Sequence, residues 1–247
     1  MKRLLPLLLL FVSFSASAQE GTIRYDRVVK IDIDLPPEME SMRDQIPTEN
    51  KTAMLLHFNE FESVMQAAPK EESDDREVRG NGFMFRMGGQ QGENITYVNH
   101  DEGLITEKRD FMGRTFLIED AQPLLAWKLT GEQSEYIGYA VQKATAVRDS
   151  STIEAWFSPQ IPVAIGPERF SGLPGAILVL SVNEGQLSFS ATEISLESVA
   201  EGAIVAPKEG RKVTQEQFDE IMEEKRKEME AQFGRRGNGA RVIMRRN

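Results

Sequence analysis

Short segments in which apolar and polar residues alternate make up most of the chain, and turn residues separate them. Residues 23–33 alternate with a period of two until Pro36-Pro37, which is typical of a β-strand that ends at proline. The same pattern predicts strands at 53–58, 60–65, 83–87, 94–99, 103–110, 114–118, 136–147, 152–157, 176–182 and 186–194. Because no helical crossovers separate these segments, we expect a mainly β protein with a curved antiparallel sheet or half-barrel.

Two of the expected hairpins have well-defined turn sequences. Arg148-Asp149-Ser150-Ser151 is a compact turn between the strands at 136–147 and 152–157. Asn183-Glu184-Gly185 joins the next pair, and Gly185 can adopt the positive φ that a tight hairpin loop requires.

The C-terminal part of the chain has a helical pattern instead. Thr214-Gln215-Glu216-Gln217 fits a capping box, and Phe218, Ile221, Met222, Lys225 and Met229 follow at helical spacing. We therefore expect a β domain over 19–210 and an amphipathic helix over 211–234 that packs on or beside the sheet and stops at Gly234. Residues 235–247 form a basic tail that we expect to be disordered, either as a solvated end or as an electrostatic arm for an acidic partner.

The N-terminal segment has the three parts of a secretory signal peptide. Met1-Lys2-Arg3 is basic, 4–14 is an apolar run too short to cross a bilayer, and Ala16-Ser17-Ala18 is a small-x-small cleavage site. We expect cleavage after Ala18 and export to the periplasm or beyond. No other stretch is apolar and long enough to predict a transmembrane segment.

Charge and cysteine content narrow the class of protein further. The formal charge is −10, and removal of Lys2 and Arg3 makes it −12, which argues against nucleic-acid binding and against adhesion to an anionic membrane. Five of the acidic residues lie in a polar segment at 69–79 that we expect to be a solvated loop. The chain has no cysteine, so its hydrophobic core has to stabilise it without disulfides.

Candidate catalytic and metal-binding residues are few. His57 and His100 are the only histidines, and no Gly-x-Ser-x-Gly turn presents a serine, so a Ser-His-Asp hydrolase lacks its usual signals. His100-Asp101-Glu102 is the one local cluster of metal-ligand type, and we interpret it as a polar turn before Gly103. Met54, Met65, Met84 and Met87 are interpreted as core residues rather than a copper site. We expect no catalytic residues, no cofactor and no metal.

The stretch WFSPQIPVAIGPERFSGLPGAILVL, residues 156–180, carries a resemblance to a known family. It is similar to the GLPGLI family of exported proteins from Gram-negative bacteria, named for a Gly-Leu-Pro-Gly-Leu-Ile signature in which Ala176 here replaces the second leucine. The matching residues are Trp156, Pro159, Pro162, Gly166, Pro167, Gly172, Leu173, Pro174, Gly175 and Ile177. Locally, Pro174-Gly175 suits a type II turn that leads into a buried strand from Ala176.

The resemblance implies an exported protein without an assigned activity, so it transfers no catalytic residue. The strands from Gly138 to Trp156 also look like lipoprotein-carrier half-barrels, which implies a hydrophobic small molecule as a possible ligand. A binding or envelope-accessory protein is the main hypothesis; an interaction module that uses the C-terminal helix to bind an envelope protein, and an envelope hydrolase, are the alternatives. A carrier would have a concave apolar face lined by Leu56, Phe58, Phe116, Trp127, Trp156 and Phe189, whereas otherwise these residues fill a closed core.

Overall fold

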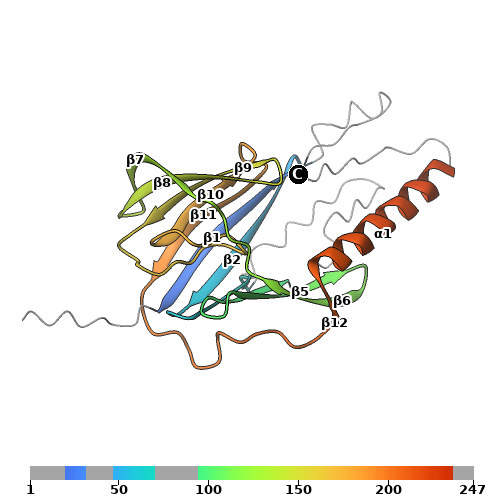
Figure 1. Ribbon diagram of the computed structural model, residues 1–247, viewed down its shortest axis with the longest axis horizontal. Helices are drawn as coiled ribbons and strands as arrows, with labels where there is room; N and C mark the ends of the chain where they lie inside the picture. The colour runs from blue at the N-terminus through green and yellow to red at the C-terminus, as the bar shows by residue number, and fades with distance from the viewer. Residues whose placement is uncertain (1–19, 32–46, 70–93, 236–247) are drawn as a thin grey trace, which may run out of the picture.

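The described part of the chain folds into one open, curved sheet of twelve strands followed by a single helix (Figure 1). The computed structural model describes residues 20–31, 47–69 and 94–235. The strands are β1 (Gly21–Lys30), β2 (Glu49–Phe58), β3 (Glu62–Ala67), β4 (Ile95–Asn99), β5 (Leu104–Phe111), β6 (Arg114–Ala121), β7 (Lys128–Tyr136), β8 (Tyr139–Arg148), β9 (Ser151–Ser158), β10 (Ala176–Val182), β11 (Leu187–Ser195) and β12 (Arg211–Val213), and the helix is α1 (Gln215–Arg235). The mainly β fold with a C-terminal helix is thus confirmed.

Several predictions concern parts of the chain outside the described residues. These are the leader at 1–18, the acidic loop from residue 70 onward, the strand at 83–87 with Met84 and Met87, and the basic tail from residue 236 onward.

The connection between β6 and β7 requires the sheet to curve. The strand order is β12-β6-β5-β4-β3-β2-β1-β11-β10-β9-β8-β7, and all neighbours are antiparallel except β12 and β6. Ten strand spacings separate β6 from β7, about 48 Å in a flat sheet. The six residues at 122–127 that join them reach at most about 25 Å. The two ends of the sheet are therefore drawn toward each other, as Figure 1 shows.

Two strands differ from the sequence prediction. The expected strand at 136–147 corresponds to β8, whereas the strand before it, β7, which joins β8 through the turn at Ile137-Gly138, was not predicted. Residues 128–135 of β7 are all exposed, so they lack the alternation by which a half-buried strand is identified. β12 was also missed, because its three residues are too few to establish a period.

Strand β7 forms one edge of the sheet and has features that limit pairing with another chain. It carries Lys128, Glu132 and Glu135, and its register with β8 shifts between Leu129 and Gln133. Gly131, with a φ of 83°, lies within this irregularity. Charges and bulges of this kind discourage edge-to-edge association.

The predicted hairpin turns are confirmed. Asp149 and Ser150 have φ values of 49° and 69°, as the two central residues of a type I′ turn require. Gly185 has a φ of 87° and ends the loop between β10 and β11, as expected. The His100-Asp101-Glu102 cluster forms the turn between β4 and β5, where the Glu102 N–H donates to Asn99 Oδ1 at 2.9 Å.

The β7–β8 turn contains an unfavourable residue and allows a stability prediction. Ile137 is β-branched and has a φ of 44°, whereas asparagine is preferred before glycine in such turns. We expect Ile137→Asn to stabilise the fold by about 1 kcal/mol, measured by urea unfolding. Met112→Asn, before Gly113 in the β5–β6 turn, is the matched control, and its gain should be smaller because methionine is unbranched at Cβ. A loss of stability in Ile137→Asn would contradict the prediction.

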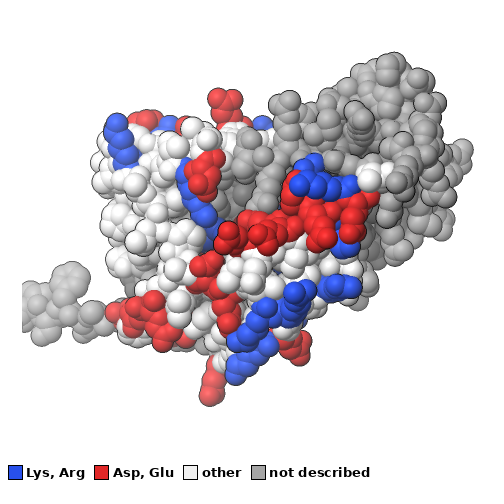
Figure 2. All heavy atoms as spheres, turned by 45° about the vertical axis from the view of Figure 1, so that its right-hand side comes forward, with Lys and Arg blue, Asp and Glu red and all other residues white. Residues whose placement is uncertain are grey.

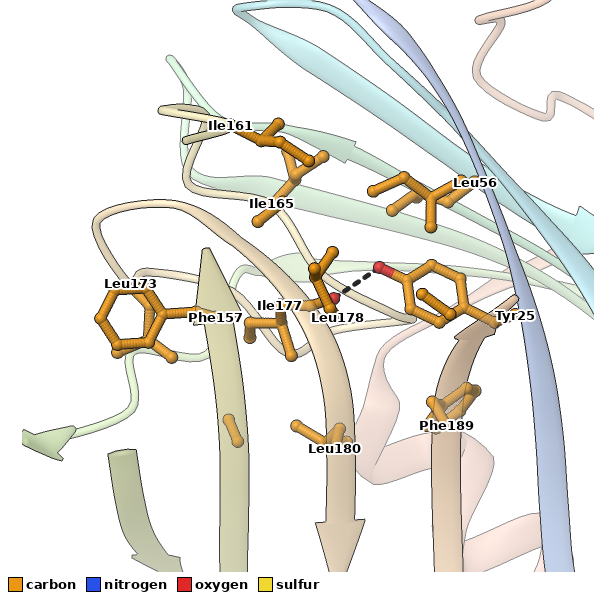
Figure 3. Close-up of a cluster of buried hydrophobic side chains, with 14 of the residues drawn as sticks. Tyr25, Leu56, Phe157, Ile161, Ile165, Leu173, Ile177, Leu178, Leu180 and Phe189 are labelled. Atoms are coloured by element: carbon orange, nitrogen blue, oxygen red, sulfur yellow. Dashed lines mark hydrogen bonds between the residues drawn. The ribbon is translucent and has the colours of Figure 1, made fainter. Parts of the chain in front are cut away.

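The main core covers the inner face of β1 to β3 and β8 to β11 (Figure 3). Its largest buried side chains include Tyr25, Phe58, Phe157 and Phe189. The Tyr25 hydroxyl donates to the Ile177 carbonyl at 2.6 Å, which satisfies a polar group in an otherwise apolar environment. Burial in turn raises the pKa of Tyr25.

Of the six residues expected to line a carrier cavity, four are buried in hydrophobic cores and two pack against the border of one. Leu56, Phe58 and Phe189 are buried in the main core, and Trp127 and Trp156 pack against its border. Phe116 lies in a second cluster, with Ile118, Val213 and Phe218. Met54 and Met65 also belong to the main core, as their interpretation as core residues predicts.

Helix α1 begins with the predicted capping box. The Gln217 N–H donates to Thr214 Oγ1 at 3.2 Å, and the Thr214 N–H donates to Gln217 Oε1 at 3.1 Å. Phe218 makes edge-to-face contacts with Phe111 and Phe116, at centroid distances of 6.3 and 5.3 Å. The first turns of α1 are therefore held on β5 and β6, and the rest of the helix extends away from the sheet (Figure 1).

Candidate functional site

The connection between β9 and β10, residues 159–175, lies across the inner face of the sheet, and we call it the motif segment. Ile161, Val163 and Ile165 are buried, while the residues between them are exposed. The Ala176 N–H donates to the Ile161 carbonyl at 3.0 Å, and the Ile177 N–H donates to the Ile165 carbonyl at 2.9 Å. The motif segment thus contributes apolar side chains to the main core and fills the concave face with the protein's own residues (Figure 3).

The structure distributes the family-motif residues between core and surface. Gly166, Pro167, Leu173, Gly175 and Ile177 are buried, Trp156 is half-buried, and Pro159, Pro162, Gly172 and Pro174 are exposed. The tight packing explains Gly166, because an added Cβ would lie 2.3 Å from the Phe170 carbonyl oxygen. The motif therefore builds a structural corner, as its local chemistry predicts.

The expected type II turn at Pro174-Gly175 is wrong in detail. The Gly175 N–H donates to the Leu173 carbonyl at 2.8 Å, a bond that spans two residues rather than three. Gly175 has a φ of 149°, far from the value of about 80° that a type II turn requires. Close contact with the Ser158 carbonyl selects this more extended conformation.

A buried ion pair joins the motif segment to the distant strand β5. Register across five strands aligns Leu56, Met65, Thr96, Glu107 and Ile118 in one row on the inner face. Glu107 is the charged member of this row, and it is 1% exposed. A carboxylate in such a place requires a cationic partner, because an unpaired buried charge is strongly destabilising.

Two arginines compensate this carboxylate. Arg169 of the motif segment forms an ion pair with Glu107 Oε2 and also donates to Gln215 Oε1 at 2.9 Å. Arg109 contacts Glu107 Oε1 at 3.0 Å. Burial lowers the pKa of Arg109, but the nearby Glu107 and Glu168 carboxylates outweigh it and raise that pKa overall. The motif segment, β5 and the start of α1 thus meet at one electrostatic node.

Further contacts attach the motif segment to β1 and β3. Glu168 accepts from Arg27 Nε at 3.1 Å, and the Glu168 N–H points to Met65 Sδ at 3.0 Å. Glu168 has a φ of 50°, an uncommon conformation for a residue other than glycine. Arg27 of β1 holds the Glu168 side chain and Met65 of β3 holds its backbone N–H, and these two contacts together account for the strained backbone conformation.

The 122–127 connection crosses the open side of the curved sheet and holds the motif segment from the other direction. Gln122 donates to the Ser171 hydroxyl, and Trp127 Nε1 donates to the Ser171 carbonyl at 2.8 Å. Beside these contacts lies a pocket of about 280 Å³, which we call the mouth pocket. Its wall includes Ile105, Glu107, Ile118, Asp120, Gln122, Arg148, Arg169 and Gln215.

The mouth pocket is the best candidate for a functional site because fixed charges of both signs face it. Asp120 comes from β6 and Arg148 from the end of β8, so its charged wall combines two distant parts of the sheet. A second pocket of about 280 Å³, near the β7–β8 hairpin, is lined by neutral residues such as Gln133, Ser134 and Gln160. Because these lining residues are neutral, the second pocket offers fewer interactions to a polar or charged ligand than the mouth pocket does.

The two histidines lie at separate positions, and each contacts a hydroxyl group. Thr22 Oγ1 and His57 Nδ1 are 2.8 Å apart, and Ser63 Oγ and His100 Nε2 are 3.1 Å apart. The second pair has the elements of a Ser-His dyad, but Ser63 is 2% exposed and lines neither pocket described above. Within the described ranges, no group of three or more His, Asp or Glu side chains is arranged to hold a metal ion.

The histidines predict a dependence of stability on pH. Burial lowers the pKa of both below the usual 6.5, with Asp101 partly opposing the effect at His100. The unfolded state therefore binds more protons as the pH falls, and stability present above pH 6.5 is lost as the pH falls toward the folded pKa values. We expect the free energy of unfolding, measured by urea titration, to decrease from pH 7.5 to 5.5 by at most about 1.4 kcal/mol per pH unit for each histidine. An unchanged slope in the His57→Asn/His100→Gln double variant would contradict this assignment.

Comparison with known families gives a match over the centre of the chain. A family model described as "Protein of unknown function (Porph_ging)" matches residues 142–179, which run from β8 through the motif segment into β10. The matched stretch includes the Gly172-Leu173-Pro174-Gly175 signature. No curated protein matches the chain in sequence.

Solved structures include similar folds. PNGF-II in space group P21 matches with a TM-score of 0.53 and 16% sequence identity, over 83% of this chain and 33% of that one. PNGF-II in space group C2 gives a TM-score of 0.53 and 15% identity, over 83% of this chain and 32% of that one. This chain thus spans about a third of the length of the PNGF-II chains, and at such identity the similarity shows the fold alone.

The charged node and the mouth pocket were both missed from the sequence. Arg169 lies within the motif stretch, but its partner Glu107 lies 62 positions away in the sequence. One signal was available: alternation within β5 places Glu107 on the same face as Ile105, where an apolar residue is expected. A charge at an inward position indicates a buried partner, although it does not identify that partner.

Proposed function

We propose that this chain is an exported periplasmic protein that binds a ligand or an envelope partner without catalysing a reaction. The observation that carries the proposal is the motif segment, which fills the concave face and leaves the polar mouth pocket as the accessible charged recess. The signal-peptide pattern at 1–18 supports export. Helix α1 lacks the apolar character of a membrane-spanning helix, and no other helix occurs in the described ranges.

The packing also favours one version of this function over another. A hydrophobic-ligand carrier needs an apolar cavity, yet five of the six side chains expected to line it belong to or border the same core as Ile161, Ile165 and Leu173 of the motif segment. A binding or envelope-accessory role, with recognition through polar groups, is therefore preferred to the transport of acyl chains.

Export and binding are tested together on the full-length chain. The protein is expressed with its leader, recovered from the periplasmic fraction, and analysed by N-terminal sequencing and native mass spectrometry. We expect a mature chain that begins at Gln19 and retains a polar ligand or a protein partner. An unprocessed cytosolic chain would contradict export, and stoichiometric bound lipid would restore the carrier hypothesis.

The hydrolase alternative has one specific observation in its favour, the Ser63–His100 contact. A fluorophosphonate probe tests it directly, with Ser63→Ala as the control. We expect no labelling, because the hydroxyl is buried. Labelling that disappears in Ser63→Ala would replace the non-catalytic proposal.

A role for α1 as an interaction module is supported by its limited contact with the sheet. Phe218 anchors its beginning, whereas residues 223, 224 and 226–228 are exposed. Charged side chains of both signs cover the part that extends away (Figure 2). Truncation after Lys225 retains the anchor, so we expect unchanged melting and loss of any partner that binds α1. Retention of every partner would exclude this role.

A further inference from the structure

The ligand class of the mouth pocket can be inferred from the groups that face it, and this inference rests on the proposed binding function. Glu107 is fully engaged, because Arg169 and Arg109 occupy its two oxygens. Of the charged side chains that line the pocket, Asp120 and Arg148 are the two that can still bind a further charged group.

Asp120 presents a carboxylate without a cationic partner among the described residues. One of its oxygens, Oδ1, accepts from the neighbouring Ala121 N–H at 2.8 Å, which is a local turn contact. Opposite Ile105 on the inner face of β6, the side chain is directed into the concavity rather than toward the outside. Such a carboxylate is suited to accept from an ammonium group.

Arg148 presents the complementary charge from the other end of the sheet. Its Nε lies 3.4 Å from Asp149 Oδ2, and within the described ranges its two terminal nitrogens make no hydrogen bond. A guanidinium with both terminal nitrogens available is suited to bind a carboxylate through two parallel hydrogen bonds. The pocket therefore places one cationic and one anionic group on separate walls.

The size of the pocket limits what can join these two charges. A volume of about 280 Å³ corresponds to roughly nine water molecules, and thus to a ligand of about ten non-hydrogen atoms. The side chains of Ile105 and Ile118 supply an apolar surface between the charged groups. These dimensions fit an amino acid or a dipeptide.

We propose that the mouth pocket binds a small zwitterion, a free amino acid or a dipeptide with both termini free, with its carboxylate on Arg148 and its ammonium on Asp120. Gln122 also lines the pocket and supplies an amide for the ligand's polar backbone. Because Asp120 is exposed and Arg148 is partly exposed, each contact is screened by water, and we expect a Kd on the order of 1 mM.

The experiment titrates the mature chain with defined ligands and follows binding by protein-observed NMR. L-alanine and L-alanyl-L-alanine distinguish the two sizes of zwitterion, and N-acetyl-L-alanyl-L-alanine and L-alanyl-L-alanine amide each lack one charge. We expect a free zwitterion to bind and each blocked dipeptide to bind about fivefold more weakly. Equal binding of free and blocked dipeptides would overturn the proposal.

Variants assign each charge to its residue. Asp120→Asn should weaken binding of the free dipeptide about fivefold without changing binding of the N-acetylated form, and Arg148→Gln should remove the difference between the free dipeptide and its amide. Glu135→Gln and Arg114→Gln, at exposed positions outside the pocket, are the matched controls and should leave the Kd unchanged. An equal loss in the controls would overturn the assignment.

The outcome for this site is separable from the outcome for the proposed function. A chain that ignores all four ligands at tenfold the expected Kd, yet retains another molecule or partner in native mass spectrometry, would overturn the zwitterion site and leave the binding function standing. Hydrolysis of the dipeptide would instead contradict the non-catalytic function.

Discussion

Replacement of Arg169 by methionine is expected to destabilise the fold by about 3 kcal/mol. Glu107 would remain buried with Arg109 as its one cationic partner, and removal of one member of a buried pair typically costs 3–5 kcal/mol. We place the value at the lower end because Arg109 stays in contact with Oε1. The loss also detaches the motif segment from β5. Urea unfolding of the mature chain measures the effect as a lower midpoint.

Two further variants test whether the loss of stability comes from the buried charge of Glu107 or from the lost packing of the Arg169 side chain. In Glu107→Met/Arg169→Met no charge is left uncompensated at that contact, so we expect the double variant to recover most of the stability lost in Arg169→Met. Lys212→Gln removes a surface ion pair, with Glu119 at 3.0 Å, and should change stability by less than about 1 kcal/mol. If the double variant is no more stable than Arg169→Met, the ion pair is not the source of the effect.

Much of the fold could be predicted from local patterns in the sequence. β1 and β9 alternate with a period of two because one face is buried, and the capping box at Thr214 is a contact between residues three positions apart. β7 offered no such signal, because a polar edge strand is exposed on both faces. β7 is a strand because it pairs with β8, and such pairing cannot be predicted from the local sequence pattern.

The candidate site depends on the same non-local information. The mouth pocket exists because the sheet curves and the 122–127 connection draws β6 toward β7, and this brings Asp120 near Arg148. Neither residue stands out in the sequence, since one is among 39 acidic residues and the other belongs to a turn. The family motif indicated where the chain changes direction. Which residues the motif segment contacts at that point is determined by the strand order.

The largest steric effect is expected at the last glycine of the motif. In Gly175→Ala the new Cβ would lie 2.2 Å from the Ser158 carbonyl oxygen and 2.6 Å from its carbon. These are backbone atoms at the end of β9, so relief requires β9 and β10 to separate where Ala176 pairs with Ser158. Together with the positive φ of 149°, the clash should cost about 4 kcal/mol in urea unfolding.

Gly113→Ala is the matched control, because it shares the positive φ without the close approach. Gly113 has a φ of 74°, and an added Cβ would meet no atom within 4 Å. Gly113→Ala should therefore lower the free energy of unfolding only by the cost of a positive φ at alanine, about 1–2 kcal/mol. The difference between the two variants measures the contact between Gly175 and the Ser158 backbone. Equal losses would mean that the signature glycine is required for its φ, and not for the close packing of the motif segment against β9.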